Sequence, residues 1–215
     1  MDIQRFKQMA MFGVMGGLLM LFGDLCFYMS PISGADFEHI AMMNVMPTNR
    51  LILGGMVGPL AGLLYGLGSM MLFIGFRRHD RRLARIVSAL FVIMLVMGGA
   101  YHAVHVMYGF IGSDDVLDLA PKITGLIVAM RDVSALAGVS ATLLFTYIVL
   151  RYDTVLPKWI VLFTPVLWTL LGPIIAPHVP YPFGGSIIGG WVNICFITFF
   201  LLCYFTVREP DKVGT

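Results

Sequence analysis

The chain has 215 residues, of which 59% are hydrophobic and 12% are charged, and its mean hydropathy is +0.88. This composition lies outside the usual range of soluble domains and predicts an integral membrane protein. The formal net charge of +2 is too small to predict a nucleic-acid-binding surface.

Apolar segments follow one another along the chain, and each is long enough to cross a membrane as a helix. A bilayer core of about 30 Å needs about 20 apolar residues in a helix, which also satisfies its own backbone polar groups. The expected spans are 9–29, 52–76, 85–111, 122–150, 158–176 and 184–207. No polar segment is long enough for a separate soluble domain, so we expect one all-α transmembrane domain over residues 1–215.

The basic residues indicate how the chain is oriented. Eleven of the fourteen Lys and Arg residues lie in the N-terminal segment, the second loop, the fourth loop and the C-terminal segment. Positive charge is retained on the cytoplasmic side, whereas the alternate loops carry the acidic residues Asp36, Glu38, Asp114, Asp115 and Asp118. We therefore expect both termini in the cytoplasm and six spans in the plasma (inner) membrane of a bacterium.

Small residues recur at four-residue spacing in several spans. The pairs and runs are Gly54, Gly58, Gly62 and Gly66; Gly13 and Gly17; Ser134 and Gly138; and Gly185 and Gly189. Close backbone approach supplies much of the association energy between helices in lipid, so this spacing predicts tight helix packing. Homo-oligomers through the same faces stay open.

Ionisable side chains interrupt three of the expected spans. A charge in the hydrocarbon costs about 2.5–3.5 kcal/mol on insertion scales, so it needs a partner or a polar cavity. Asp24 lies in the first span, His102 and His105 lie in the third, and the adjacent Arg131 and Asp132 lie in the fourth. In the expected orientation all five map to the outer half of the membrane. We predict one polar site there, with Asp24, His102, His105 and Asp132 as its catalytic groups.

Further polar side chains lie within reach of the same layer. Tyr101, His105 and Tyr108 share one helical stripe by their i, i+4, i+7 spacing. The expected ligand-binding residues are Arg131, Tyr28, Tyr101, Tyr108, Ser134 and Asn193.

Arg131 and Asp132 are sequence neighbours, about 100° apart around a helix, so they are expected to face different partners. We expect Arg131 to pair with Asp24, and Asp132 to orient His102 or His105.

The sequence does not assign a metal site, and the cofactor stays open. His102 and His105 are three residues apart and could hold one metal ion together with Asp24 or Asp132, but no HExxH motif or second histidine pair accompanies them. Haem is disfavoured because neighbours on one helix cannot take opposite axial positions.

The first outer loop offers a separate set of soft ligands. His39 is followed by Met42, Met43 and Met46, and thioethers suit Cu(I). Since the chain has 16 methionines, packing or contact with the membrane surface is the default interpretation of this group.

Two carboxylates, two imidazoles and a guanidinium at one depth are typical of a proton-handling or ligand-binding pocket. We expect a membrane-embedded enzyme or binding protein that acts by general acid/base chemistry on an apolar or lipid-like small molecule, with membrane lipids around it. A small proton-coupled transporter and a non-catalytic subunit of a larger membrane complex are the alternatives, so enzyme status stays open. A purely structural role, in which buried ion pairs fix helix register, also stays open.

Overall fold

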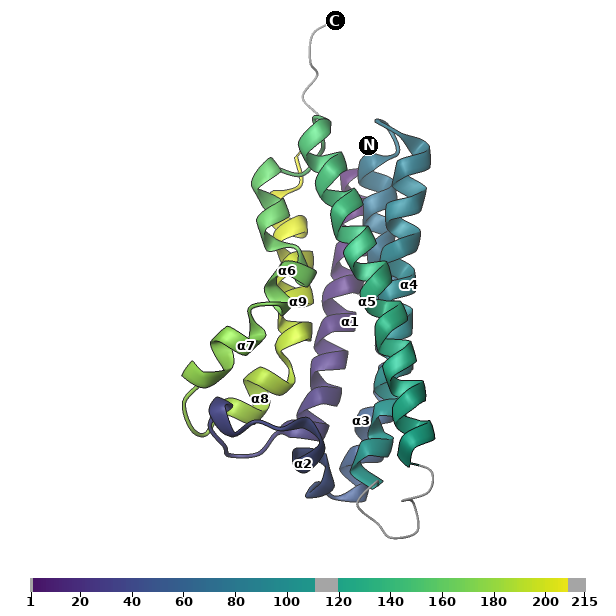
Figure 1. The fold of residues 1–215 in the computed structure, drawn as a ribbon. Helices are drawn as coiled ribbons and strands as arrows, with labels where there is room; N and C mark the ends of the chain where they lie inside the picture. Colours follow the sequence, from purple (N-terminus) through teal and green to yellow (C-terminus); the bar gives the residue numbers. More distant parts are fainter. Residues whose placement is uncertain (1, 111–119, 209–215) are drawn as a thin grey trace, which may run out of the picture.

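The computed structural model describes residues 2–110 and 120–208, and these fold as helices joined by short connections (Figure 1). Its α-helices are α1 (Ile3–Tyr28), α2 (His39–Asn44), α3 (Thr48–Phe76), α4 (Arg81–His105), α5 (Ala120–Arg151), α6 (Pro165–Thr169), α7 (Gly172–Ile175), α8 (Gly184–Gly189) and α9 (Trp191–Thr206). Its 3-10 helices are η1 (Gly34–Asp36), η2 (Val106–Phe110), η4 (Lys158–Phe163) and η5 (Ala176–His178). Within the described ranges β pairing is limited to one isolated bridge, between Ile32 and Phe183. The predicted all-α fold is confirmed.

Four helices in the described ranges are long and apolar enough to cross a membrane. They are Ile3–Tyr28, Thr48–Phe76, Arg81–Phe110 and Pro121–Arg151. They correspond to the first four predicted spans, although residue 111, the last of the predicted third span, lies outside the described residues. The predicted acidic loop residues Asp114, Asp115 and Asp118 lie outside them as well.

The fifth and sixth predicted spans are not continuous helices. Segment 158–176 is divided into η4, α6 and α7; Pro165 is the first residue of α6 and Pro173 is the second residue of α7. Proline has no backbone N–H to continue the ladder of the preceding turn, which explains the breaks. Segment 184–207 is divided at Gly190 into α8 and the 16-residue α9. In Figure 1 the first segment descends along the bundle and the second returns beside α1.

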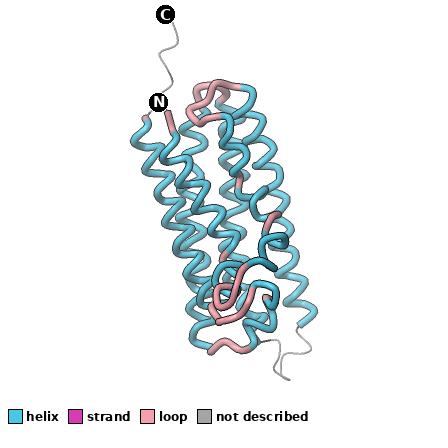
Figure 2. The backbone as a smooth tube through the Cα atoms, turned by 90° about the vertical axis from the view of Figure 1, so that its left-hand side faces the viewer, coloured by secondary structure: helices cyan, strands magenta, loops and turns pink. Residues whose placement is uncertain are grey.

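The long helices lie side by side, and their connections gather at the two ends (Figure 2). The start of α1, the turn between α3 and α4, and the ends of α5 and α9 share one end, while α2, α7 and α8 lie toward the other (Figure 1). The arginine-rich turn at residues 77–82 and the start of η4 at Lys158 are therefore at the same end. Among the described residues, the basic segments that the sequence grouped together do share one end of the molecule; Lys212 lies outside the described residues.

Aspartate side chains cap two of the long helices at this basic end. Asp2 accepts a hydrogen bond from the backbone N–H of Arg5 at 3.0 Å, at the start of α1. Asp80 accepts from the N–H groups of Arg82 and Leu83 at 2.8 and 2.9 Å, at the start of α4. Each carboxylate satisfies N–H groups that have no partner in the first turn of a helix.

Glycines bring α1, α3 and α4 into close contact. A Cβ added to Gly58 on α3 would lie 2.7 Å from the carbonyl oxygen of Gly99 on α4, and one on Gly68 would lie 2.5 Å from Cα of Gly13 on α1. Real Cβ atoms do not approach backbone so closely, so these crossings require glycine. The predicted packing role of the small residues is confirmed at these positions, and this part of the glycine face of α3 is covered within the chain.

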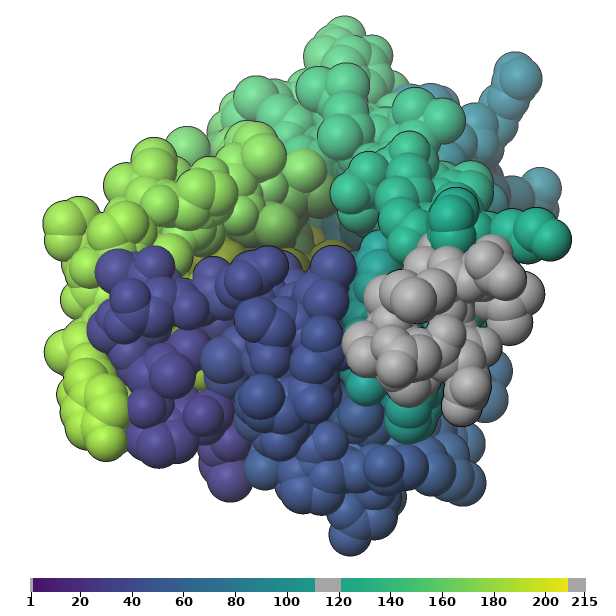
Figure 3. Space-filling model, turned by 60° about the horizontal axis from the view of Figure 1, so that its bottom comes forward, coloured from purple at the N-terminus to yellow at the C-terminus, as the bar shows by residue number. Residues whose placement is uncertain are grey.

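The buried side chains form two hydrophobic clusters. The larger lies along α1, α3, α4, α5 and α9. The smaller contains Phe27, Tyr28, Met42, Met43 and Leu51 and lies where α2 covers the ends of α1 and α3. Figure 3 shows this end of the molecule, with the segment before α3 (purple to blue) beside the segment around α8 (yellow-green). The two segments are joined by backbone hydrogen bonds, from Gly34 to Val179 and from Gly184 to Ile32, both at 2.9 Å.

Candidate functional site

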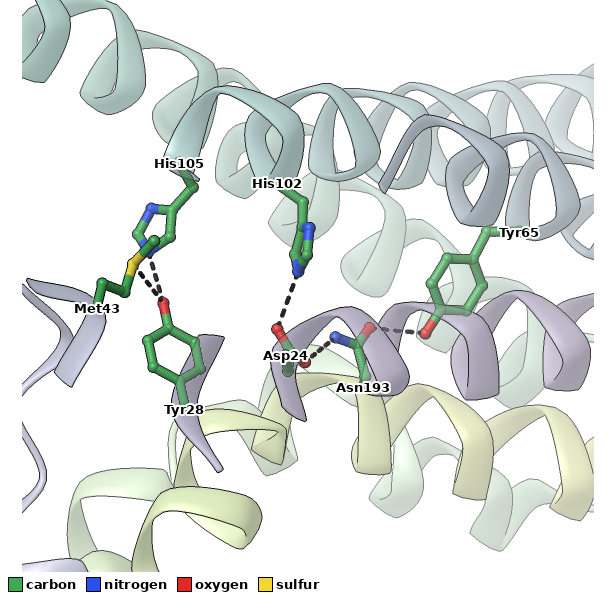
Figure 4. Close-up of polar contacts among 7 residues, drawn as sticks. All are labelled: Asp24, Tyr28, Met43, Tyr65, His102, His105 and Asn193. Atoms are coloured by element: carbon green, nitrogen blue, oxygen red, sulfur yellow. Dashed lines mark hydrogen bonds and ion pairs between the residues drawn. The ribbon is translucent and has the colours of Figure 1, made fainter. Parts of the chain in front are cut away.

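Asp24 and His102 form a buried pair between α1 and α4. Nε2 of His102 lies 3.2 Å from Oδ1 of Asp24, and each residue is 6% exposed (Figure 4). A carboxylate can only accept a hydrogen bond, so the Nε2–H group of His102 donates to Asp24. One carboxylate and one imidazole are thus in direct contact in the interior.

A hydrogen-bonded chain continues from Asp24 across two more helices. Nδ2 of Asn193 on α9 donates to Oδ2 of Asp24 at 2.6 Å, and the Tyr65 hydroxyl on α3 donates to Oδ1 of Asn193 at 2.8 Å. Because Asp24 only accepts, the amide must turn its NH₂ group toward Asp24 and its oxygen toward Tyr65. Side chains from α1, α3, α4 and α9 therefore meet in one chain of hydrogen bonds, which Figure 4 shows.

A second pair lies one turn farther along α1 and α4, beneath α2. The Tyr28 hydroxyl is 2.6 Å from Nε2 of His105 and 3.6 Å from the sulfur of Met43. Asp24 and Tyr28 are four residues apart on α1, and the two histidines are three apart on α4, so each pair of neighbours shares a helix face. The two contacts are successive rungs between the helices (Figure 4).

The second ring nitrogen of each histidine is unused. Nδ1 of His102 and Nδ1 of His105 are buried and have no hydrogen-bond partner among the described residues. With its Nε2–H donating to Asp24, a neutral His102 carries a lone pair on Nδ1. An imidazole held by a carboxylate on one nitrogen and free on the other has the arrangement of a general base.

Aromatic rings surround the two histidines. The ring of Phe27 stacks on His102, with centroids 4.6 Å apart and planes 19° apart. The rings of Tyr101 and Tyr108 each lie 5.0 Å from the ring of His105. The three residues of the predicted stripe therefore lie together, and their role in binding stays a prediction. The low dielectric of these rings strengthens the polar contacts that they enclose.

Glycines make room for the side chains of the site. A Cβ on Gly23 would lie 2.7 Å from Cε1 of His102, and one on Gly189 would lie 2.6 Å from Cβ of Tyr28. Gly185, the other member of that predicted small-residue pair, faces the backbone carbonyl of Tyr28. The glycine pair in α8 thus sets the position of Tyr28.

Arg131 and Asp132 lie outside this buried group. Nε and Nη2 of Arg131 bond to Oδ1 of Asp132 at 3.0 and 2.9 Å, and the two side chains are 60% and 61% exposed. The expected pairs of Arg131 with Asp24 and of Asp132 with His102 or His105 are therefore wrong. The arginine side chain is long enough to reach Asp132, although neighbouring residues lie about 100° apart around a helix. Both side chains lie on an exposed face of α5.

Ser134 also has a different partner from the one that a catalytic role would need. Its hydroxyl donates to the backbone carbonyl of Met94 at 2.8 Å, which joins α5 to α4. A Cβ on Gly138, one turn away, would lie 2.7 Å from the Met94 sulfur. Ser134 and Gly138 therefore act at the predicted helix contact. No hydrogen bond in the described chain joins Ser134 to His102 or His105.

Two residues of the site were not among the predicted ones. Tyr65 was not singled out from the sequence, and Met43 was assigned with His39 to the separate set of soft ligands in the first outer loop. A buried tyrosine hydroxyl needs a hydrogen-bond partner, and this need is the signal that could have drawn attention to Tyr65. Its partner, Asn193, is 128 positions away, and no spacing rule connects the two. Met43 is one of 16 methionines, and nothing in its spacing links it to the first and third predicted spans.

His39 extends the second rung toward the surface. Its ring lies 4.7 Å from that of Phe37 and 5.2 Å from that of Tyr28. Loss of hydration lowers the pKa of His39 below 6.5, and the Asp24 charge opposes this shift. Within the described ranges, no group of three or more His, Cys, Asp and Glu side chains could hold a metal ion. His102 and His105 instead have separate partners, Asp24 and Tyr28.

A surface cavity of about 360 Å³ lies on another part of the molecule, between α3 and α4 near the basic end. It is lined by Met70, Phe73, Arg85, Ser88, Ala89, Val92 and Ile93. None of the site residues contributes to it.

Comparisons with curated proteins and with solved structures found no match to the chain. A protein-family model matches residues 1–209, which is nearly the whole sequence. Its description is a family of unknown function, DUF6796, and the chain belongs to that family.

Proposed function

We propose that this chain is a membrane-embedded enzyme or binding protein that carries out general acid/base chemistry on an apolar or lipid-like small molecule. The contact of Asp24 with His102 is the observation that supports this proposal most. A buried carboxylate and imidazole at 3.2 Å, with Nδ1 of the histidine unpaired, are the parts that proton abstraction requires.

In the proposed mechanism His102 is the base. Its Nδ1 takes a proton from the substrate, and the Asp24 carboxylate stabilises the imidazolium that forms. Asn193 keeps the carboxylate in place through its 2.6 Å hydrogen bond. Return of the proton from Nδ1 to the product restores neutral His102. The Tyr28 and His105 pair, one turn away, is the second proton-bearing group, and Tyr101 and Tyr108 line its surroundings.

We place the protein in the plasma (inner) membrane of a bacterium, with six passes and both terminal segments in the cytoplasm. Four long apolar helices support four of the passes. The broken segments 158–176 and 184–207 are proposed as the other two. The basic residues at one end support the orientation, because cytoplasmic segments carry the excess of Lys and Arg. The site then lies in the outer half of the bilayer, where membrane lipids and an apolar substrate reach it laterally.

A proton-coupled transporter is the second candidate. The observation that favours it is the chain of hydrogen bonds from Tyr65 through Asn193 and Asp24 to His102, because such a chain can carry a proton along the bundle. Proton flux into liposomes that contain the purified protein separates the two candidates. Flux that Asp24→Asn abolishes would favour the transporter, and a proton-tight wild type favours the acid/base site.

The acid/base proposal is tested by identifying what co-purifies with the protein. Wild type, His102→Gln and the control Ser134→Ala are purified in mild detergent, and extracts are compared by mass spectrometry. We expect an apolar molecule in the wild type and the control, and its unconverted precursor in a folded His102→Gln variant. The same molecule at the same occupancy in all three proteins would contradict the proposal.

A further inference from the structure

The surface cavity between α3 and α4 is a groove that begins near the arginine-rich turn joining these helices. Its volume of about 360 Å³ is in the range of about 300–1,000 Å³ that is usual for small-molecule sites. On α4 the groove is lined from residue 85 to residue 93, at the i, i+3, i+4 spacing of one helix face. At a rise of about 1.5 Å per residue, this face extends for about 12 Å. That length is close to the thickness of one leaflet of the hydrocarbon core, about 15 Å.

The groove is shaped to hold an apolar chain. Ala89 and Ser88 are small and leave space, while Met70, Phe73 and Ile93 are larger and line the same groove. The Ser88 hydroxyl oxygen is buried, so it presents no polar group to a molecule in the groove. A polar ligand would lose hydrogen bonds to water along such a surface, whereas an acyl chain would not.

One charged residue lines the groove, near the turn. Arg85 lies in the second turn of α4 and is exposed, and it is also the first residue of the predicted third span. Side chains of a helix tilt toward its N-terminus, which for α4 is at the basic end of the molecule (Figure 1). The aliphatic stem of Arg85 can therefore follow the groove while its guanidinium reaches the polar surface of the membrane.

A second guanidinium lies beside the same end of the groove. The Arg77 guanidinium is 6.0 Å from the centroid of the Phe73 ring, and Phe73 lines the groove. Within residues 2–110 and 120–208, neither Arg77 nor Arg85 forms an ion pair. The acidic side chain of the turn, Asp80, accepts hydrogen bonds from backbone N–H groups at the start of α4. Two cations without an anionic partner thus stand where the apolar groove begins.

From this arrangement we propose that the groove binds one anionic phospholipid of the surrounding leaflet. One acyl chain lies between α3 and α4, and the phosphate contacts Arg85 and Arg77, since a guanidinium can donate two hydrogen bonds to one phosphate. The turn and the start of α4 favour a headgroup with net negative charge, because they hold five arginines: Arg77, Arg78, Arg81, Arg82 and Arg85. The inference rests on the proposed membrane placement and not on the acid/base chemistry at Asp24 and His102.

The test is native mass spectrometry of the full-length protein in mild detergent. The protein is incubated with equal amounts of phosphatidylglycerol and phosphatidylethanolamine that have the same acyl chains. We expect the wild type to retain one phosphatidylglycerol per chain in preference to phosphatidylethanolamine. Arg85→Gln should weaken this binding by about fivefold, the factor for one arginine beside an anionic headgroup. Arg151→Gln is the matched control, because Arg151 is exposed at the same end of the molecule and does not line the groove.

A second pair of variants tests the place of the acyl chain. Ala89→Leu fills the groove and should abolish the preferential retention of phosphatidylglycerol. Ala135→Leu is its control, since Ala135 is also an exposed alanine of a long helix but does not line the groove. Glycerol phosphate, which has a phosphate but no acyl chain, should not displace the lipid.

Four outcomes would each overturn the proposal. They are equal retention of the two lipids by the wild type, equal affinities for Arg85→Gln and Arg151→Gln, equal retention by Ala89→Leu and Ala135→Leu, and displacement of the lipid by glycerol phosphate. All four substitutions are at exposed positions, so the variants should fold, and their far-ultraviolet circular dichroism spectra should match that of the wild type.

Discussion

Asn193 donates a 2.6 Å hydrogen bond to Asp24, across 169 positions of the sequence. The contact joins α9 to α1, the helix around which α3 and α9 are arranged. It also satisfies one oxygen of the Asp24 carboxylate, which is only 6% exposed. His102 satisfies the other oxygen. The same bond therefore serves helix packing and the chemistry of the candidate site.

Replacing Asn193 should destabilise the fold measurably. Asn193→Ala leaves Oδ2 of Asp24 and the Tyr65 hydroxyl buried without a partner, so the free energy of unfolding should fall by about 1–3 kcal/mol. Thr198→Val is the control on the same helix, because within residues 2–110 and 120–208 the Thr198 hydroxyl bonds only to the carbonyl of Ile194 in α9, at 2.8 Å. Chemical unfolding in detergent measures both. An Asn193→Ala protein as stable as Thr198→Val would contradict the assigned hydrogen bonds.

Double-mutant cycles should place the partner of Asp24 on α4 and not on α5. Asp24→Asn and His102→Gln remove the same contact, so their costs in stability should differ from additivity by about 0.5–3 kcal/mol. Asp24→Asn and Arg131→Gln have no shared contact and should add to within about 0.5 kcal/mol. Coupling between Asp24 and Arg131 would restore the pairing that the sequence predicted.

Two neighbouring glycines of α3 should respond differently to alanine. In Gly68→Ala the new Cβ would lie 2.5 Å from the backbone of Gly13, so α1 and α3 must separate, at a cost of about 1–3 kcal/mol. In Gly66→Ala the nearest atom is Cγ2 of Val96 at 3.5 Å, and alanine gains up to about 1 kcal/mol in helix propensity. Thermal melting of the two variants in the same detergent gives the comparison. Equal melting temperatures would argue against the close crossing.

The proposed orientation predicts which loops a membrane-impermeant maleimide can label in intact cells. The three native cysteines, Cys26, Cys195 and Cys203, are buried and give a low background. Ala35→Cys in the segment before α2 should react from outside. His79→Cys in the turn between α3 and α4 should react only after permeabilisation. The opposite pattern would invert the orientation and move the site to the cytoplasmic half.

The candidate site was predicted in part. The free-energy cost of placing an ionisable side chain in the membrane was enough to single out Asp24, His102 and His105. Such a residue in an apolar segment needs a polar partner whatever the tertiary fold. The same argument selected Arg131 and Asp132, which instead satisfy each other on an exposed face of α5. Burial of a position depends on how α5 is rotated against α4, and the sequence of α5 has polar and apolar residues on several faces.

The sequence by itself determined the helical class, the four long apolar helices and the grouping of basic segments at one end. These follow from local composition and length, since each helix satisfies its own backbone. Only the tertiary structure decided that Tyr65 and Met43 join the site, and that Asp24 pairs with His102. Those contacts connect segments far apart in the chain, and the close glycine crossings of α1, α3 and α4 fix which side chains can reach one another.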